Sequence, residues 1–174
     1  SWQNSGILNF TVAINLSASQ FHHQNLVEEV MKTLADYNLT TDYIELELTE
    51  GLMVDNVEEA ILIINHLHDK GIKISIDDFG TGYSSLSYLK QFKIDKLKID
   101  QSFVSEIAME PDNAAIVNTI IALAKNLGLR TIAEGVETIE QEAFLRNIGC
   151  NEVQGYLYSK ALSAEEFETF IAKL

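Results

Sequence analysis

Short, nearly continuous apolar runs alternate with longer amphipathic stretches along the whole chain. Such a run is typical of a strand buried on both faces, and apolar residues at helical spacing indicate a helix with one buried side. The pattern predicts strands at Phe10–Leu16, Tyr43–Leu48, Ile72–Ile76, Lys96–Ile99, Arg130–Ala133 and Glu152–Tyr156. It predicts helices at Asn25–Tyr37, Val57–Leu67, Ser84–Gln91, Asn113–Asn126, Ile139–Ile148 and Ala164–Leu174.

The order of these elements predicts a parallel sheet. Strands that alternate with helices at steps of about thirty residues are typical of βαβ units. Such a sheet is either open and doubly wound or closed into a barrel. The first predicted strand is followed by neither a Gly-x-Gly-x-x-Gly sequence nor a P-loop, which disfavours the open nucleotide-binding sheet.

Polar residues at the ends of the predicted strands favour the barrel. In a (β/α)8 barrel the carboxyl ends of all strands converge on one mouth, where active sites lie. All six predicted strands carry charged or amide side chains at or near this end, namely Asn15, Glu47, Asp77, Asp78, Lys98, Asp100, Glu134 and Gln154. We therefore predict an α/β fold of the modified TIM-barrel type, in which residues 1–174 supply about six βα units. About two further units are expected to precede Ser1.

The adjacent residues Asp77 and Asp78 end the third predicted strand. Neighbours on a strand point to opposite faces, so two acidic residues at its end indicate a backbone that is already turning. Like charges this close repel and raise each other's pKa, and a divalent cation would compensate them. The alternative is a simple Asp-Asp turn before a flexible loop, and the pair alone does not decide between them. The five other strand ends at the same rim favour the cation.

Composition limits the partners of the chain. It has 26 acidic and 12 basic residues, a formal net charge of −14, which disfavours a nucleic-acid polymer or an anionic membrane surface as the main partner. A small phosphate ligand fits this charge if metal ions stand between it and the acidic side chains. No apolar run approaches the length of a membrane span, so we expect no direct membrane contact.

Cysteine and histidine give little sign of chemistry. Cys150 is the single cysteine, which allows no internal disulfide and predicts a reducing compartment such as the cytoplasm. His66 and His68 lie two residues apart on a predicted helix and do not share a face, so a zinc pair is not expected. The chain begins without an initiating methionine or a signal pattern and looks like a piece of a longer protein, which could itself be membrane-anchored.

Six sequence motifs occur at the strand ends, spread over the chain. They are Ile14-Asn15-Leu16-Ser17, Glu45-Leu46-Glu47-Leu48-Thr49-Glu50, Asp77-Asp78-Phe79-Gly80-Thr81-Gly82-Tyr83-Ser84-Ser85-Leu86, Lys98-Ile99-Asp100-Gln101-Ser102-Phe103-Val104, Ala133-Glu134-Gly135-Val136-Glu137-Thr138 and Gln154-Gly155-Tyr156. In this order and spacing they resemble the EAL domain, a family of cyclic-di-GMP phosphodiesterases with a modified TIM-barrel fold. The Glu-Ala-Leu signature that names the family, with its metal-binding glutamate and a nearby arginine, would lie upstream of Ser1. A smaller departure is Tyr158-Ser159-Lys160-Ala161, where many relatives have Phe-Ser and a final Pro.

The resemblance implies two divalent cations, Mg²⁺ or Mn²⁺, at the barrel mouth. Oxygen ligands suit these hard cations, and the implied ligands are Asn15, Glu47, Asp77, Asp78 and Glu134, with Asp77 bridging both ions. The implied catalytic residues are Lys98, Glu134, Asp77 and Asp78. Lys98 would neutralise charge near the attacking water or a phosphate oxygen. The residues implied to bind substrate or support the site are Gln154, Glu137, Asp100 and Glu50.

The implied activity is hydrolysis of cyclic di-GMP to linear pGpG in bacterial second-messenger signalling. The alternative is a catalytically inactive domain that acts as a cyclic-di-GMP receptor or a protein-interaction module, because the signature glutamate is not in this chain. A different metal-dependent TIM-barrel enzyme is a third interpretation. The loop from Asp78 to Leu86, held by Glu50, is expected to close over the substrate. This loop, or sheet edges left exposed, would also form a homodimer.

Overall fold

The computed structural model describes residues 10–53, 56–82, 86–107 and 109–173. Within them six parallel strands form one sheet whose spatial order follows the order along the chain. The strands are β1 (Val12–Asn15), β2 (Ile44–Thr49), β3 (Lys73–Phe79), β4 (Lys96–Ile99), β5 (Arg130–Ala133) and β6 (Glu152–Val153). A sheet that never reverses its strand order winds in one direction, as the wall of a barrel does. The parallel α/β architecture predicted from the sequence is confirmed.

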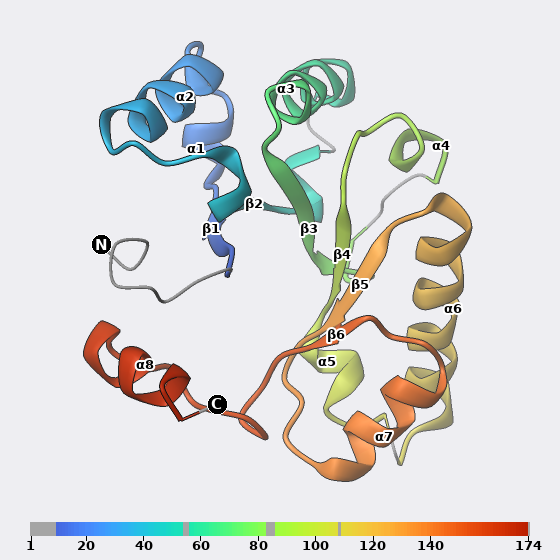
Figure 1. The fold of residues 1–174 in the computed structure, drawn as a ribbon. Coiled ribbons are helices and arrows are strands. Elements are labelled where there is room, and N and C mark those ends of the chain that lie inside the picture. Colours follow the sequence, from blue (N-terminus) through green and yellow to red (C-terminus); the bar gives the residue numbers. More distant parts are fainter. Residues whose placement is uncertain (1–9, 54–55, 83–85, 108, 174) are drawn as a thin grey trace.

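Helices connect the strands and cover one face of the sheet. The α-helices are α1 (Ala18–Phe21), α2 (Leu26–Asp36), α3 (Val57–Asp69), α4 (Leu86–Leu89), α5 (Gln101–Val104), α6 (Pro111–Leu127), α7 (Ile139–Asn147) and α8 (Ala164–Ile171). The 3₁₀ helices η1 (Thr41–Tyr43) and η2 (Glu50–Met53) flank β2. Figure 1 shows the helices around the outside of the curved sheet, with α2 and α3 at the top and α6 and α7 at the lower right. The C-terminal helix α8 returns to the start of the sheet, where the Phe167 ring packs 5.4 Å from the ring of Phe10.

The two faces of the sheet differ in chemistry because side chains alternate along each strand. The apolar residues of one set, such as Leu48, Ile76 and Leu97, are completely buried in a core shared with Ile64 of α3 and Val117 of α6. The alternate residues face the inside of the half-barrel. Most of them are charged or polar, and the list includes Glu45, Glu47, Ser75, Asp77, Lys96, Lys98 and Glu152. The fold therefore separates an apolar outer layer from a charged interior.

The last strand is shorter than predicted, ending at Val153 rather than Tyr156. The chain leaves the sheet at Gly155, which presses against the backbone of Val136. A Cβ atom at this position would lie 2.1 Å from the carbonyl oxygen of Val136, so a residue with a side chain does not fit. The N–H of Leu157 then donates to that same carbonyl oxygen at 3.0 Å.

The short α-helices α1 and α5 and the two 3₁₀ helices were not predicted, because three or four residues are too few to show apolar periodicity. Both α1 and α5 begin within three residues of a strand end, at a side chain that caps the helix. Ser17 accepts from the N–H of Gln20 before α1, and Asp100 accepts from the N–H of Ser102 at 2.9 Å before α5. The polar residues at the strand ends thus also start helices.

Candidate metal centre

Four neighbouring strands bring charged side chains to one end of the half-barrel. Glu47 lies near the end of β2 and Lys98 near the end of β4. Asp77 of β3 lies beside Thr49 in the register of the sheet. Glu134 follows β5 directly, and its N–H donates to the carbonyl oxygen of Ile99 at 3.1 Å. Residues far apart in the sequence therefore meet at the carboxyl edge, as the strand-end pattern predicts.

The backbone turns at the aspartate pair. Asp78 has a φ of +54°, which is unusual for a residue with a side chain, and the register between β3 and β4 shifts between Ile76 and Phe79. The Asp77 carboxylate accepts the N–H of Asp78 at 3.0 Å. Because of this turn the two carboxylates reach the same end of the sheet. A strain of this kind is typical of functional sites.

The carboxylates of Asp77, Asp78 and Glu134 form a compact group. Each offers one oxygen atom, and these three atoms lie within 4.8 Å of one another. Carboxylate oxygens are the ligands that Mg²⁺ and Mn²⁺ prefer in proteins. The donor set and its spacing therefore fit a divalent cation held between β3 and β5.

The ammonium group of Lys98 lies among the same carboxylates. Its Nζ is 2.8 Å from Oε1 of Glu47, 3.0 Å from Oδ1 of Asp77 and 2.8 Å from Oε1 of Glu134. The side chain is 6 % exposed. Burial alone would lower the pKa of Lys98, but the hydrogen bonds to Glu134, Glu47 and Asp77 outweigh it and raise the pKa well above its usual value. Lys98 is thus a permanently charged centre of this cluster.

Burial and crowding also shift the pKa values of the acidic groups. Burial, followed by the charge of Asp77 and a hydrogen bond with Asp100, raises the pKa of Asp78. Burial tends to raise the pKa of Asp100, but hydrogen bonds from Ser102 outweigh this effect and lower it. Burial raises the pKa of Glu134 although Lys98 opposes this change. The site holds more negative charge than its single ammonium group neutralises.

Glu50 holds the start of the loop that follows β3. Its Oε2 accepts the N–H of Gly80 at 3.1 Å and the N–H of Gly82 at 3.2 Å. A Cβ atom at position 82 would lie 3.0 Å from the Glu50 carboxyl carbon, so glycine lets the backbone approach this closely. The loop continues through residues 83–85, which lie outside the described residues, so its predicted part in a lid or a dimer is not tested.

The remaining predicted residues lie around the group rather than in it. Asn15 is exposed at the end of β1, next to Glu47 in the register of the sheet. Gln154 lines the same interior hollow as Glu47 and Lys98, a cavity of about 580 Å³. Glu137 is exposed, and its N–H donates to Oε1 of Gln141 at 2.7 Å. Within the described part of the chain, the ion pairs and hydrogen bonds of Asp77 and Glu134 go to Lys98, Asp78 and Ile99, and to none of these three residues.

A second charged cluster at the other end of the half-barrel was not predicted. Lys96 Nζ is 3.0 Å from Oε2 of Glu45 and 3.2 Å from Oε2 of Glu152. Arg130 lies 3.1 Å from the other oxygen of Glu152. Lys96 precedes Lys98 by two residues, as Glu45 precedes Glu47, and this spacing puts each pair on one face of its strand. This repeated two-residue spacing is the feature of the sequence from which the second cluster could have been predicted.

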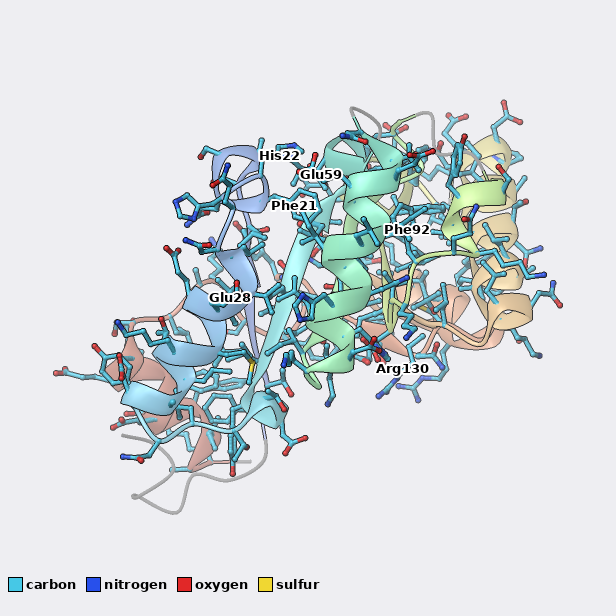
Figure 2. All side chains as sticks on the ribbon, turned by 90° about the horizontal axis from the view of Figure 1, so that it is seen from above. Phe21, His22, Glu28, Glu59, Phe92 and Arg130 are labelled. Atoms are coloured by element: carbon cyan, nitrogen blue, oxygen red, sulfur yellow. The ribbon has the colours of Figure 1, made fainter. Side chains whose placement is uncertain are left out.

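The surface near α1 and α3 carries other ionisable groups, away from the cluster. His22 follows α1, and its Nδ1 lies 3.9 Å from Oε2 of Glu59 on α3 (Figure 2). Figure 2 shows Glu28 on this same side of the molecule, well separated from Arg130. These groups do not take part in the site. Among the described helices, none is both long and apolar enough to span a membrane.

Comparison with known proteins gives a consistent assignment. Residues 1–161 match the EAL domain. The bifunctional diguanylate cyclase/cyclic di-GMP phosphodiesterase MucR of Pseudomonas aeruginosa is 43% identical over 171 residues, 98% of this chain and 25% of that protein. The cyclic di-GMP phosphodiesterase PdeR of Escherichia coli is 42% identical over 167 residues, 96% of this chain and 25% of that protein. The chain thus spans about a quarter of the length of these curated relatives.

Solved structures agree with this match. The c-di-GMP complex of the PaMucR phosphodiesterase superimposes with a TM-score of 0.92 at 43% identity, over 95% of this chain and 67% of that one. A manganese and cyclic di-GMP complex of BlrP1 from Klebsiella pneumoniae gives a TM-score of 0.82 at 34% identity, over 91% of this chain and 41% of that one. The half-barrel is therefore the strand arrangement of the predicted modified TIM barrel. The chain belongs to the EAL domain family.

Proposed function

We propose that this domain hydrolyses cyclic di-GMP to linear pGpG with the help of two divalent cations, Mg²⁺ or Mn²⁺, in bacterial second-messenger signalling. The observation that carries the proposal is the convergence of Asp77, Asp78 and Glu134 within 4.8 Å, beside the ammonium of Lys98. Relatives that are named cyclic di-GMP phosphodiesterases, and a related structure with manganese and cyclic di-GMP, support it.

The proposed reaction is the addition of water across one phosphodiester bond. A P–O bond forms to the water oxygen, the bond from phosphorus to one 3′-oxygen breaks, and a proton from the water ends on that oxygen. Divalent cations at such a site neutralise the phosphate and stabilise charge on the attacking and leaving oxygens. The ligands would be Asn15, Glu47, Asp77, Asp78 and Glu134, with Asp77 shared.

The protein's own groups would orient and neutralise the substrate. Lys98 supplies a fixed positive charge next to Asp77 and Glu134, where it can balance a phosphate oxygen or orient the attacking water. Glu50 fixes the loop after β3 through its backbone amides. Gln154 lines the interior hollow, and Asp100 shares a hydrogen bond with Asp78. Together with Glu137, these residues would contact the substrate or support the acidic residues.

The test is to incubate the purified protein with Mg²⁺ or Mn²⁺ and cyclic di-GMP and to separate the nucleotides by chromatography. We expect pGpG to accumulate and the reaction to stop when EDTA is added. Asp77→Asn is the negative variant, because it removes the proposed shared ligand. Saturable binding of cyclic di-GMP without product would contradict catalysis and favour the receptor alternative. Retained metal binding without nucleotide binding would favour a different metalloenzyme.

We also propose that two copies associate. The support is β1, whose four residues are all exposed and which pairs with β2 alone among the described strands. A strand that pairs on one side only, among the described strands, can offer its other edge to a second copy. Light scattering coupled to size-exclusion chromatography tests this, and a stable monomer at every concentration would contradict it. We place the activity in the cytoplasm, which suits a chain with one cysteine.

A further inference from the structure

We propose that Lys98 competes with divalent cations for the acidic centre, so that it holds the carboxylates in the metal-free protein and weakens metal binding. This inference rests on the proposed metal centre. It assigns to Lys98 a role in setting metal affinity, in addition to the charge that it would offer to the substrate.

The first support is that the ammonium and the cation would use the same carboxylates. Asp77 and Glu134 belong to the group of oxygens within 4.8 Å, and both also accept a hydrogen bond from Lys98. An ammonium group has three donors. Lys98 directs all three to carboxylates, since Glu47 is its third partner at 2.8 Å. Its hydrogen-bonding capacity is therefore fully used inside the centre.

The second support is the burial of Lys98. The side chain is 6 % exposed, and the side chains of Glu47 and Asp77 are 9 % and 13 % exposed. Solvent screens charges weakly in such a place, so a divalent ion that enters is repelled by the ammonium group. To bind tightly, the ion has to displace the ammonium from shared carboxylates or tolerate it as a neighbour. Both lower the affinity.

The opposite role, in which Lys98 positions the ligands and strengthens metal binding, is the physical competitor. Loss of a group that orients metal ligands commonly weakens binding tenfold or more. Backbone bonds already help to place two of these ligands, however. The Asp77 carboxylate is held by the N–H of Asp78 at 3.0 Å, and the main chain at Glu134 is held by its N–H, which donates to the carbonyl oxygen of Ile99 at 3.1 Å. Charge repulsion is therefore the larger effect.

Lys96 provides a matched control on the same strand. It has the same charge, faces the same interior and binds two carboxylates, Glu45 at 3.0 Å and Glu152 at 3.2 Å. Neither carboxylate belongs to the group of Asp77, Asp78 and Glu134. Removal of the Lys96 charge should disturb the half-barrel without changing competition at the metal centre.

The experiment measures Mn²⁺ binding by the electron paramagnetic resonance signal of free Mn²⁺, at one pH, in the wild type, Lys98→Met, Lys98→Arg and Lys96→Met. We expect Lys98→Met to bind Mn²⁺ at least about tenfold more tightly than the wild type. Lys98→Arg keeps the positive charge, and Lys96→Met changes a residue outside the metal centre. The Mn²⁺ affinity of each of these two variants should therefore stay within about threefold of the wild type. Lys98→Gln, also neutral but able to donate a hydrogen bond, replaces Lys98→Met if the latter does not fold.

Thermal unfolding supplies the second measurement. In EDTA, Lys98→Met should unfold at a lower temperature than the wild type, because three carboxylates lose their shared cation. Saturating Mn²⁺ should then raise its melting temperature more than that of the wild type. Equal or weaker Mn²⁺ binding by the neutral variants, or no Mn²⁺ binding by any of these proteins, would overturn the inference. Absence of pGpG formation with Mn²⁺ binding intact would contradict the proposed function alone.

Discussion

Two lysines on strand β4, two residues apart, sit at opposite ends of the same charged interior. Lys98 binds Glu47, Asp77 and Glu134, and the further carboxylate of Asp78 lies beside the last two. Lys96 binds Glu45 and Glu152, and the cation of Arg130 also binds Glu152. Each lysine is the hub of an ion cluster, buried around Lys98 and only partly buried around Lys96, where the Arg130 side chain is 65% exposed.

The difference between the clusters is their balance of charge. Around Lys98, four carboxylates face one ammonium group. The cluster therefore keeps a net negative charge that a divalent cation can neutralise. Around Lys96, two carboxylates face two cations, and the cluster is complete without a ligand. Distances of about 3 Å occur in both, so geometry alone does not distinguish them. The count of charges is what distinguishes the proposed metal centre from a structural ion cluster.

The largest difference between the two clusters is expected when Glu47 or Glu45 is substituted and phosphodiesterase activity is measured. Both glutamates face the same interior from β2. Glu47→Gln removes a proposed metal ligand, and we expect a loss of phosphodiesterase activity of at least about a hundredfold. Glu45→Gln leaves the acidic centre intact and should keep activity per folded molecule within about threefold of the wild type. Initial rates of pGpG formation at saturating Mn²⁺ measure both. Similar losses in the two variants would mean that the clusters act as one unit.

The sequence predicted this division only in part. Residues at strand ends could be identified because parallel strands place their carboxyl ends together, so Glu47, Asp77 and Glu134 were expected to meet. The aspartate pair could be identified because two adjacent carboxylates at a strand end require a turn. The structure supplies that turn through the positive φ of Asp78. The position of these residues along the chain, at the ends of predicted strands, was sufficient to identify them.

Contacts that depend on which strands face one another could not be predicted. Lys96 reaches Glu152, 56 residues away, across the interior from β4 to β6, and no local pattern fixes such a pairing. The same holds for the position of the Lys98 ammonium among three carboxylates. Gln141 was also missed, although it is buried and its side-chain N–H donates to the carbonyl oxygen of Ser105 at 2.9 Å. A polar residue on a helix gives no sign of burial until the helix is packed.

The same two glutamate variants should also differ in the free energy of unfolding, where Glu45→Gln is expected to have the larger effect. This effect is smaller than the effect of Glu47→Gln on activity. Glu45→Gln leaves the partly buried ammonium of Lys96 with one carboxylate, and we expect the free energy of unfolding to fall by about 1–3 kcal/mol. Glu47→Gln leaves Lys98 with two carboxylates and removes one repelling charge, so its cost should be below about 1 kcal/mol. Urea unfolding in EDTA gives both values. A larger loss for Glu47→Gln would contradict the difference in charge balance.

The smallest expected effect concerns Cys150, which reports on the Lys96 cluster. Its Sγ donates to the carbonyl oxygen of Glu152 at 3.2 Å, and burial raises the pKa of its thiol. Because the thiolate is the reactive form, labelling by a thiol reagent at pH 8 should be slower than that of an unfolded chain. Strand β6 has only two residues, and the bonds from Glu152 to Lys96 and Arg130 help to hold it.

Glu152→Gln should therefore let β6 open more often. A loss of about 1 kcal/mol would raise the open population, and with it the labelling rate of Cys150, about fivefold. Glu47→Gln is the matched variant in the other cluster and should leave the rate unchanged, because its ion-pair partner Lys98 lies on β4 and binds no residue of β6. Mass spectrometry of the labelled protein over time measures both rates. Equal rates in the wild type and Glu152→Gln would show that the ion pairs of the Lys96 cluster do not hold β6, and that its balanced charges are neutral to local stability.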